Sequence, residues 1–367
     1  MKDVASFRIH YTQFLDPAGT PVESLPDFAR EPAVLIDLYR GMVAARQFDK
    51  KAIAMQRTGQ LGTYASCLGQ EAIGAGIGHA MRPEDVLLPS YRDQAAQFPR
   101  GVRMTDILLY WGGDERGMDY ARCREDFPIC VPVASQCCHA VGVAYAFKYR
   151  GEARAAVCIV GDGGTSKGDF YEALNAAGIW RLPVVFVINN NQWAISVPRA
   201  EQTAAETLAQ KAIAAGVAGE QIDGNDVIAV RYAVDRALGK ARRGDGPSLI
   251  EALSYRMGDH TTADNASRYR SAGEVERYGR ADPIARLRAY LLRAADWKEE
   301  DEARLERSVA AEVEQAVRDY TAMPIANPES MFAHLYAALP RAYRVQRETA
   351  GCAGSEYTSR AEHEPRP

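Results

Sequence analysis

The stretch that most constrains the fold of this chain runs from Ala155 to Pro198. It begins with a short, β-branched apolar run that stops at Gly161, a pattern typical of a fully buried strand. Apolar residues at helical spacing follow, and Pro183 precedes a second apolar run at Val184–Ile188. Two strands joined by such a helix are parallel. The sequence therefore predicts an α/β fold with three layers, a mostly parallel sheet with helices on both faces, and a helical C-terminal region.

Polar residues follow both of these strands directly. Asp162 comes after the first strand and Asn191 after the second. The carboxyl ends of parallel strands share one edge of the sheet, where open α/β folds bind ligands. A carboxylate and an amide oxygen suit a hard cation such as Mg²⁺, and the N–H groups of Gly163 and Gly164 at a helix start favour an anion. The pattern predicts a diphosphate held through Mg²⁺.

Two common nucleotide sites do not match this stretch. The P-loop pattern G-x-x-x-x-G-K-[ST] is absent. A dinucleotide fingerprint would need glycine or alanine where Ser166 stands, and an acid where Asn189 stands. Gly-Asp-Gly followed one crossover later by Asn-Asn is instead similar to the thiamine diphosphate motif. The alternative interpretation is an ordinary turn between strand and helix, followed by a polar loop.

Two further polar residues are predicted near the same edge. Arg92 follows the apolar run Val86–Tyr91, where its planar fork suits a phosphate oxygen. The alternative for Arg92 is a surface ion pair. His260 lies in the polar segment Gly258–Ser271 after another predicted strand, and it can contact a phosphate or act in acid–base chemistry. The alternative for His260 is an exposed loop histidine.

Three other ionisable residues near these motifs are interpreted as structural. His139 lies inside a small-residue helix predicted over Ser135–Lys148, so we interpret it as a packed core residue. Glu71 and Glu172 lie near the motifs, and we expect each to serve packing or a helix end.

The composition sets the broad class of protein. The chain has 367 residues and a net charge of −4, which gives no reason to expect binding to nucleic acid or to a membrane. No run approaches the length of a transmembrane helix, and the N-terminus lacks the apolar core of a signal peptide. The seven cysteines include no C-x-x-C pair. We therefore expect reduced thiols and a cytoplasmic location.

The expected organisation has three parts. Residues 1–32 are punctuated by four prolines and predict an extended N-terminal arm. Residues 33–340 are expected to form one diphosphate-binding domain that includes the C-terminal helices. Residues 341–367 are expected to be a polar tail, disordered at its end.

Five motifs resemble the alpha subunit of the thiamine-dependent 2-oxoacid dehydrogenases. They read GTYASCLGQEA, PSYRDQAA, GDGGTSKGDFYEALNAAG, NNNQWAISVP and YRMGDHTTADNASRYR. The likeness extends from about Ala33 to Tyr290. It is strongest to bacterial two-subunit pyruvate dehydrogenase and next to the branched-chain 2-oxoacid enzyme.

The resemblance implies a set of contacts with Mg²⁺ and the diphosphate. Asp162, Asn191 and the backbone carbonyl of Trp193 would ligate Mg²⁺. Gly163 and Gly164 would meet the diphosphate through their N–H groups.

The resemblance also implies contacts from other parts of the chain. Tyr91, Arg92 and His260 would bind oxygens of the diphosphate. Val131 and Val133 would touch the aminopyrimidine through backbone atoms. His260 would also face the substrate carboxylate or the incoming lipoyl group, which makes it the expected catalytic residue.

Three positions depart from the pattern of these relatives. Asp259 stands where the pyruvate enzymes usually carry proline, which adds a negative charge beside the anion site. Asn265 replaces the second acid of an Asp-Asp pair, and Gln192 stands where many relatives carry arginine.

The resemblance implies an enzyme that carries out oxidative decarboxylation of pyruvate with reductive acyl transfer to a lipoyl group. The cofactors would be thiamine diphosphate and Mg²⁺. Activation of the cofactor needs a glutamate, and this chain has room for only one diphosphate-binding domain. A separate beta subunit would supply that glutamate, in a heterotetramer with two copies of each subunit. The acyl group would pass to the lipoyl domain of a dihydrolipoyl acyltransferase.

Other functions stay open on the sequence alone. Within the same family, the substrate could be a branched-chain 2-oxo acid or acetoin. From other classes, we consider a Mg²⁺-dependent phosphohydrolase that uses Asp162 as nucleophile, and a non-catalytic subunit that only binds nucleotide.

Overall fold

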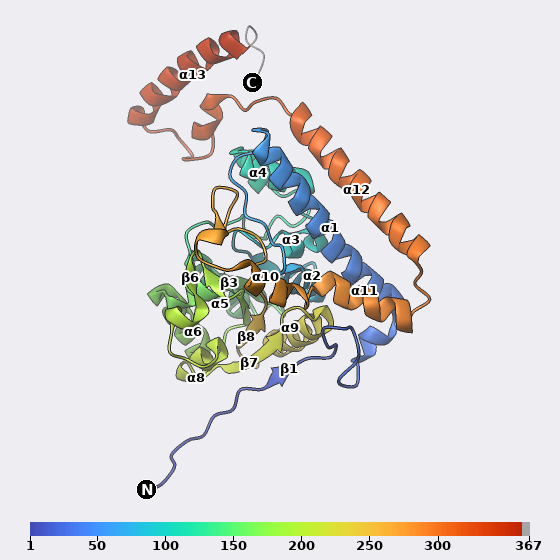
Figure 1. Ribbon diagram of the computed structural model, residues 1–367. Coiled ribbons are helices and arrows are strands. Elements are labelled where there is room, and N and C mark those ends of the chain that lie inside the picture. Colours follow the sequence, from blue (N-terminus) through green and yellow to red (C-terminus); the bar gives the residue numbers. More distant parts are fainter. Residues whose placement is uncertain (362–367) are drawn as a thin grey trace. The chain divides into compact units, whose positions relative to one another are not determined.

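The computed structural model describes residues 1–361, with side chains to residue 351. Within these residues, six parallel strands form one sheet in the order β1-β7-β8-β4-β3-β2 (Figure 1). A separate antiparallel hairpin joins β5 and β6. The strand bounds are β1 Tyr11–Thr12, β2 Val86–Leu88, β3 Ala156–Gly161, β4 Val184–Asn190, β5 Trp193–Ala194, β6 Val197–Pro198, β7 Ala218–Asp223 and β8 Ser248–Leu253.

Helices connect these strands and continue beyond the last one. The α-helices are α1 Pro32–Arg57, α2 Glu71–Ala80, α3 Gln94–Arg100, α4 Met104–Trp111, α5 Ser135–Arg150, α6 Gly168–Ile179, α7 Arg199–Gln202, α8 Lys211–Ala214, α9 Val227–Arg242, α10 Ala272–Gly279, α11 Pro283–Ala294, α12 Glu299–Ala322 and α13 Arg341–Ala361. The 3₁₀ turns are η1 Asp27–Arg30, η2 Glu115–Met118, η3 Asp162–Ser166, η4 Leu208–Gln210, η5 Ala266–Arg268 and η6 Pro328–Phe332.

Alternate residues of the central strands enter two separate apolar cores. On β3, Cys158 and Val160 pack with residues of α5 and α6 on one face. Val157 and Ile159 pack with residues of α2 and α9 on the other face. Both faces of the sheet are thus covered, which is why its strands read as continuous apolar runs. The predicted three-layer α/β fold is confirmed.

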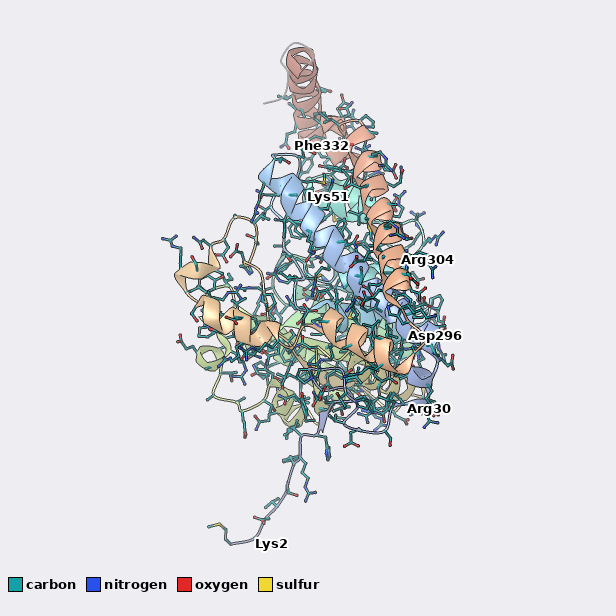
Figure 2. All side chains as sticks on the ribbon, turned by 45° about the vertical axis from the view of Figure 1, so that its right-hand side comes forward. Lys2, Arg30, Lys51, Asp296, Arg304 and Phe332 are labelled. Atoms are coloured by element: carbon teal, nitrogen blue, oxygen red, sulfur yellow. The ribbon has the colours of Figure 1, made fainter. Side chains whose placement is uncertain are left out.

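Helix α1 lies outside α2 and runs beside α12 (Figure 1). Polar contacts join the two long helices: Lys51 Nζ lies 2.7 Å from a carboxylate oxygen of Glu314, and the Tyr39 hydroxyl donates to Glu302. Figure 2 shows Lys51 on α1 next to α12, the helix that also carries Arg304. Charged residues of α12 are therefore partly used for packing against α1.

The N-terminal segment joins the edge of the sheet. Tyr11–Thr12 pairs in parallel with β7. The N–H groups of Phe14 and Leu15 then donate to Asp226 Oδ2 at 2.7 and 2.8 Å. The other oxygen of Asp226 accepts from the first N–H groups of α9 and so caps this helix. One fully buried carboxylate therefore holds both the arm and the start of α9.

A second compact unit begins at Arg318, before the boundary at residue 340 that the sequence suggests. In this unit α13 packs against η6. The segment expected as a polar tail is helical over Arg341–Ala361. The reason is that its polar residues are mostly good helix formers, and no proline interrupts them. The expected disorder at the end of the tail concerns residues 362–367, which lie outside the described residues.

We predict that Asp226→Ala lowers the free energy of unfolding by about 2–4 kcal/mol, since it removes a helix cap and leaves buried N–H groups without an acceptor. Thermal melting and limited proteolysis of the N-terminal segment would measure the effect. Asp235→Ala, an exposed acid on the same helix, is the control. Equal melting temperatures for the two variants would contradict this role of Asp226.

Candidate functional site

A cavity of about 500 Å³ opens at the carboxyl ends of the central strands. Every site residue predicted from the sequence lines it, namely Tyr91, Arg92, Val131, Val133, Asp162, Gly163, Gly164, Asn191, Trp193 and His260. These residues come from the ends of β2, β3, β4 and β8 and from the loop before α5. The structure therefore brings the whole set to one place, while the role of each residue stays a prediction.

Asp162 is a buried acid without a cationic partner. Its side chain begins η3 directly after β3 and is 2% exposed. Burial raises the pKa of this carboxyl, and a hydrogen bond from Gln202 Nε2 to Asp162 Oδ2, 2.7 Å long, opposes that rise. No ion pair among the described side chains includes Asp162. Because an unpaired buried carboxylate is unfavourable, its surroundings fit a bound cation.

Asn191 and Trp193 line the same cavity at the end of β4. Asn191 Nδ2 donates to Gln70 Oε1 at 3.0 Å, and Asn191 Oδ1 accepts from the N–H of Trp193 at 3.2 Å. The carbonyl of Trp193 accepts from Arg256 at 3.3 Å. One carboxylate, one amide oxygen and one carbonyl are oxygen donors of the type that Mg²⁺ prefers. Within the described residues, no group of three or more His, Cys, Asp and Glu side chains could hold a metal.

The turn after β3 requires its glycines. A Cβ atom on Gly163 would lie 2.6 Å from the Cβ of Ala194, and one on Gly164 would lie 2.6 Å from Cγ2 of Val160. Lys211 also stabilises the turn, because its buried ammonium donates to the carbonyl of Thr165 at 2.8 Å. Close packing thus requires glycine at both positions, and both glycines line the cavity.

Arg92 is a buried cation without an acidic partner. It is 6% exposed, and the ion pairs among the described side chains do not include it. Its Nη1 donates to the carbonyl of Ser66 at 2.9 Å, and its Nη2 donates to the carbonyl of His260 at 2.7 Å. The surface ion pair considered as an alternative is therefore wrong. A desolvated guanidinium that lines a cavity suits an anion.

His260 is half-buried beside this guanidinium. Its Nδ1 lies 3.0 Å from Arg92 Nη2, so Nδ1 is the acceptor and the proton of the neutral ring is on Nε2. Burial lowers the pKa of His260 to about 4, and the positive charges of Arg92 and Arg256 contribute. The ring is therefore neutral at pH 7 and can donate one hydrogen bond through Nε2. An exposed loop histidine, the alternative, does not describe this environment.

The loop after β8 is held by its own polar residues. Asp264 accepts from the N–H of His260 at 2.8 Å. Asp259 accepts from the N–H of Ala266 at 2.9 Å, and Asn265 accepts from the N–H of Ser267 at 3.2 Å. The two departures from the family pattern thus form turns within the loop. Asp259 is exposed.

The third departure, Gln192, lies in the connection between β4 and the hairpin. It adopts a φ of +72°, and its Nε2 donates to Asn190 Oδ1 at 2.9 Å. This amide contact stabilises a backbone conformation that side chains other than glycine rarely adopt.

One interpretation of the nearby ionisable residues is wrong. His139 is exposed, not packed in the core. Helix α5 faces the sheet with residues such as Ala140, Ala144 and Phe147, and His139 lies about 100° around the helix from this buried face. Glu71 does serve packing, since it is fully buried and pairs with Arg46 at 2.6 Å.

Sequence reasoning missed two glutamines that contact the predicted metal ligands. Gln202 reaches Asp162 across 40 residues, and Gln70 reaches Asn191 across 121 residues. Gln70 belongs to a motif quoted above, but nothing in its local pattern distinguishes a contact to a distant asparagine from a surface amide.

These features define the class of protein: a parallel α/β domain with a ligand cavity at the carboxyl ends of its central strands. The particular family follows from sequence comparison. Residues 39–329 match the dehydrogenase E1 component family, and the chain belongs to it.

Several curated relatives cover almost the whole chain. The pyruvate dehydrogenase E1 component subunit alpha of Acholeplasma laidlawii is 41% identical over 317 residues, which are 86% of this chain and 92% of the relative. The 3-methyl-2-oxobutanoate dehydrogenase subunit alpha of Mycobacterium tuberculosis is 39% identical over 340 residues, 92% of each chain. The pyruvate dehydrogenase E1 component subunit alpha of Staphylococcus aureus is 37% identical over 344 residues, which are 93% of this chain and 92% of the relative.

The predicted family is thus confirmed. The chain is an alpha subunit of a 2-oxoacid dehydrogenase E1 component, and this membership implies thiamine diphosphate as cofactor and a beta subunit as partner. Among its described residues, no helix is long and apolar enough to span a membrane.

We predict that His260 makes stability depend on pH between about 6.5 and 4. In this window the unfolded chain holds a proton on the imidazole that the folded chain does not, so stability falls as the pH falls and this contribution levels off below about 4. His260→Gln should therefore reduce the loss of melting temperature between pH 7.5 and 5. His139→Gln, which replaces an exposed histidine, is the control. A wild-type pH slope in His260→Gln would contradict the assignment.

Proposed function

We propose that this chain is the alpha subunit of a pyruvate dehydrogenase (acetyl-transferring) that is active only with a beta subunit. The observation that carries the proposal is the charge pattern of the cavity. Asp162 is a buried acid without a cationic partner and Arg92 a buried cation without an acidic one, and both line the same space. A magnesium–diphosphate group carries charges complementary to both.

The predicted ligands of this group are retained in the proposal. Asp162, Asn191 and the carbonyl of Trp193 would hold Mg²⁺, and the backbone of Gly163 and Gly164 would meet the diphosphate. Support comes from the chemistry of these atoms and from their shared cavity. Mg²⁺ keeps several ligands from phosphate and water, so three protein oxygens are enough.

The remaining cavity residues would bind the anion and the ring of the cofactor. Arg92 supplies a permanent charge for diphosphate oxygens, and Tyr91 lies beside His260 with the two rings edge to face. Val131 and Val133 would contact the aminopyrimidine through backbone atoms.

When bound, thiamine diphosphate supplies the carbon nucleophile and the electron sink for decarboxylation of a 2-oxo acid. The protein would orient the substrate and control its protons. His260 is neutral and carries its proton on Nε2, so it can donate to the substrate carboxylate or to the lipoyl group. Arg92 fixes this tautomer, because its donor occupies Nδ1.

The partner would complete the site from outside. The side chains of Val131 and Val133 are 52% and 47% exposed at the cavity, and Ile195 beside them is also exposed. Apolar residues around a polar cavity suit a protein surface that closes over it. We infer that this surface is the beta subunit with its activating glutamate, in a heterotetramer of two alpha and two beta chains. The lipoyl domain of the acyltransferase is the proposed acyl acceptor, and the cytoplasmic location stays a prediction.

A branched-chain 2-oxo acid is the second candidate substrate, because the relative from M. tuberculosis is named for 3-methyl-2-oxobutanoate. The phosphohydrolase alternative is less well supported. Such an enzyme needs a second acid close to its nucleophile, and Asp162 is the only acid among the described residues that line the cavity.

We predict that Asp162→Ala abolishes Mg²⁺-dependent binding of thiamine diphosphate to the co-purified alpha–beta pair, since it removes the one carboxylate among the described residues that line the cavity. Isothermal titration calorimetry at saturating Mg²⁺ measures this binding, and ATP should not bind to the wild type. Asp169→Ala, which removes an acid in the first turn of α6, should bind as the wild type does. Unchanged affinity in Asp162→Ala would remove the metal assignment.

We predict that the reconstituted pair has a kcat/KM for pyruvate at least about tenfold above that for 3-methyl-2-oxobutanoate, because a pocket shaped for a methyl group excludes the extra methyl groups. Steady-state assays with both substrates measure the ratio. The alpha chain alone should turn over neither substrate. A reversed ratio would make the branched-chain 2-oxo acid the substrate, and robust turnover by the lone chain would disprove the split site.

A further inference from the structure

Gln202 binds one oxygen of the predicted metal carboxylate. Its Nε2 donates to Asp162 Oδ2 at 2.7 Å and to the carbonyl of Val197 at 3.2 Å. Both neighbours are acceptors, so the nitrogen must be on this side of the amide. The contact fixes the direction of Oδ2, and a carboxylate has about four lone-pair sites, so the group still has lone pairs for a cation.

Gln70 makes the matching contact to the other predicted side-chain ligand. Its Oε1 accepts from Asn191 Nδ2 at 3.0 Å, while Asn191 Oδ1 accepts from the backbone N–H of Trp193. The backbone donor fixes which end of the Asn191 amide is oxygen. Gln70 therefore binds the NH₂ end of the Asn191 amide, whose hydrogens would repel a cation. This contact holds the orientation in which Oδ1 is the other end.

Each glutamine also has one buried polar atom without a hydrogen bond. This atom is Nε2 in Gln70 and Oε1 in Gln202. Gln70 is 2% exposed and lines the cavity, and Gln202 Oε1 lies 3.9 Å from the position that a Cβ atom of Gly163 would take. Unpaired buried polar atoms are uncommon in native proteins. A free donor suits a phosphate oxygen, and a free acceptor suits a water molecule bound to the cation.

We propose that Gln70 and Gln202 are positioning residues of the magnesium–diphosphate site. Each glutamine orients one ligand side chain through a single amide hydrogen bond, so that an oxygen atom of Asp162 and of Asn191 is presented to the ion. The proposal rests on the function proposed above. Partners that orient metal ligands typically contribute 10-fold to 100-fold to metal affinity.

The test compares Gln202→Met, Gln70→Met and the wild type as co-purified alpha–beta pairs. Methionine has nearly the same length as glutamine but neither an amide donor nor an amide acceptor. The measured quantity is the Mg²⁺ concentration that gives half-maximal binding of thiamine diphosphate, followed by calorimetry or protein fluorescence. We expect it to rise about 10-fold to 100-fold in each variant, with binding recovered at saturating Mg²⁺. Asparagine at either position, one methylene shorter, should shift it in the same direction.

Gln97→Met is the matched control. Gln97 is also buried, donates a single hydrogen bond to the Tyr120 hydroxyl and has an unpaired Oε1, but it is not among the residues that line the cavity. This variant should lose a similar amount of thermal stability while its Mg²⁺ dependence stays within about twofold of the wild type.

Several results would overturn the proposal. A Mg²⁺ dependence within twofold of the wild type in both glutamine variants would show that the two contacts do not orient ligands. A loss of binding that saturating Mg²⁺ recovers in neither glutamine variant would assign the glutamines to direct contacts with the cofactor and not to orientation of the metal ligands. If the wild-type pair binds no thiamine diphosphate at any Mg²⁺ concentration, the proposed function itself fails.

Discussion

Two buried residues of opposite charge, Asp162 and Arg92, determine which ligand charges this cavity suits. Neither residue forms an ion pair with another described side chain. In most proteins such groups pair with each other or stay near water, because transfer of a lone charge into the interior is unfavourable. Here each is held by neutral groups instead, a glutamine amide for the acid and backbone carbonyls for the arginine. Their charges therefore stay available for a ligand that carries both signs.

The parallel sheet makes this arrangement possible. Its carboxyl edge places the ends of β2, β3, β4 and β8 next to each other, so that residues far apart in the sequence meet. A further buried acid supports the loop that holds Arg92. Asp49 accepts from Ser66 Oγ at 2.5 Å, from the N–H of Cys67 at 2.7 Å and from Gln94 Nε2 at 2.8 Å. The carbonyl of Ser66 can then accept from Arg92, so the position of the guanidinium depends on a network that reaches back to α1.

The sequence was sufficient to predict the fold and the sheet edge where the candidate residues meet, because both depend on local signals. A β-branched run, a glycine turn and a polar residue after each strand identify the sheet edge without tertiary information. The prediction that His139 packs in the core was wrong, because a helix made mostly of small residues has little amphipathic contrast to show which face is buried. The contacts of Gln70 and Gln202 could not be predicted from the sequence. They join residues 121 and 40 positions apart, and each depends on the orientation of a side-chain amide in the folded protein.

The exposed valines support the proposal that a second chain completes the site. Val131 and Val133 place apolar side chains at a cavity that contains separated charges, and water reaches them in the isolated subunit. Electrostatic attraction between ligand and protein is weak in water and strengthens when water is excluded. A partner that covers these residues would therefore strengthen the attraction of Asp162 and Arg92 for a charged cofactor. Assembly and cofactor binding should then stabilise each other, because each favours the same closed, water-poor cavity.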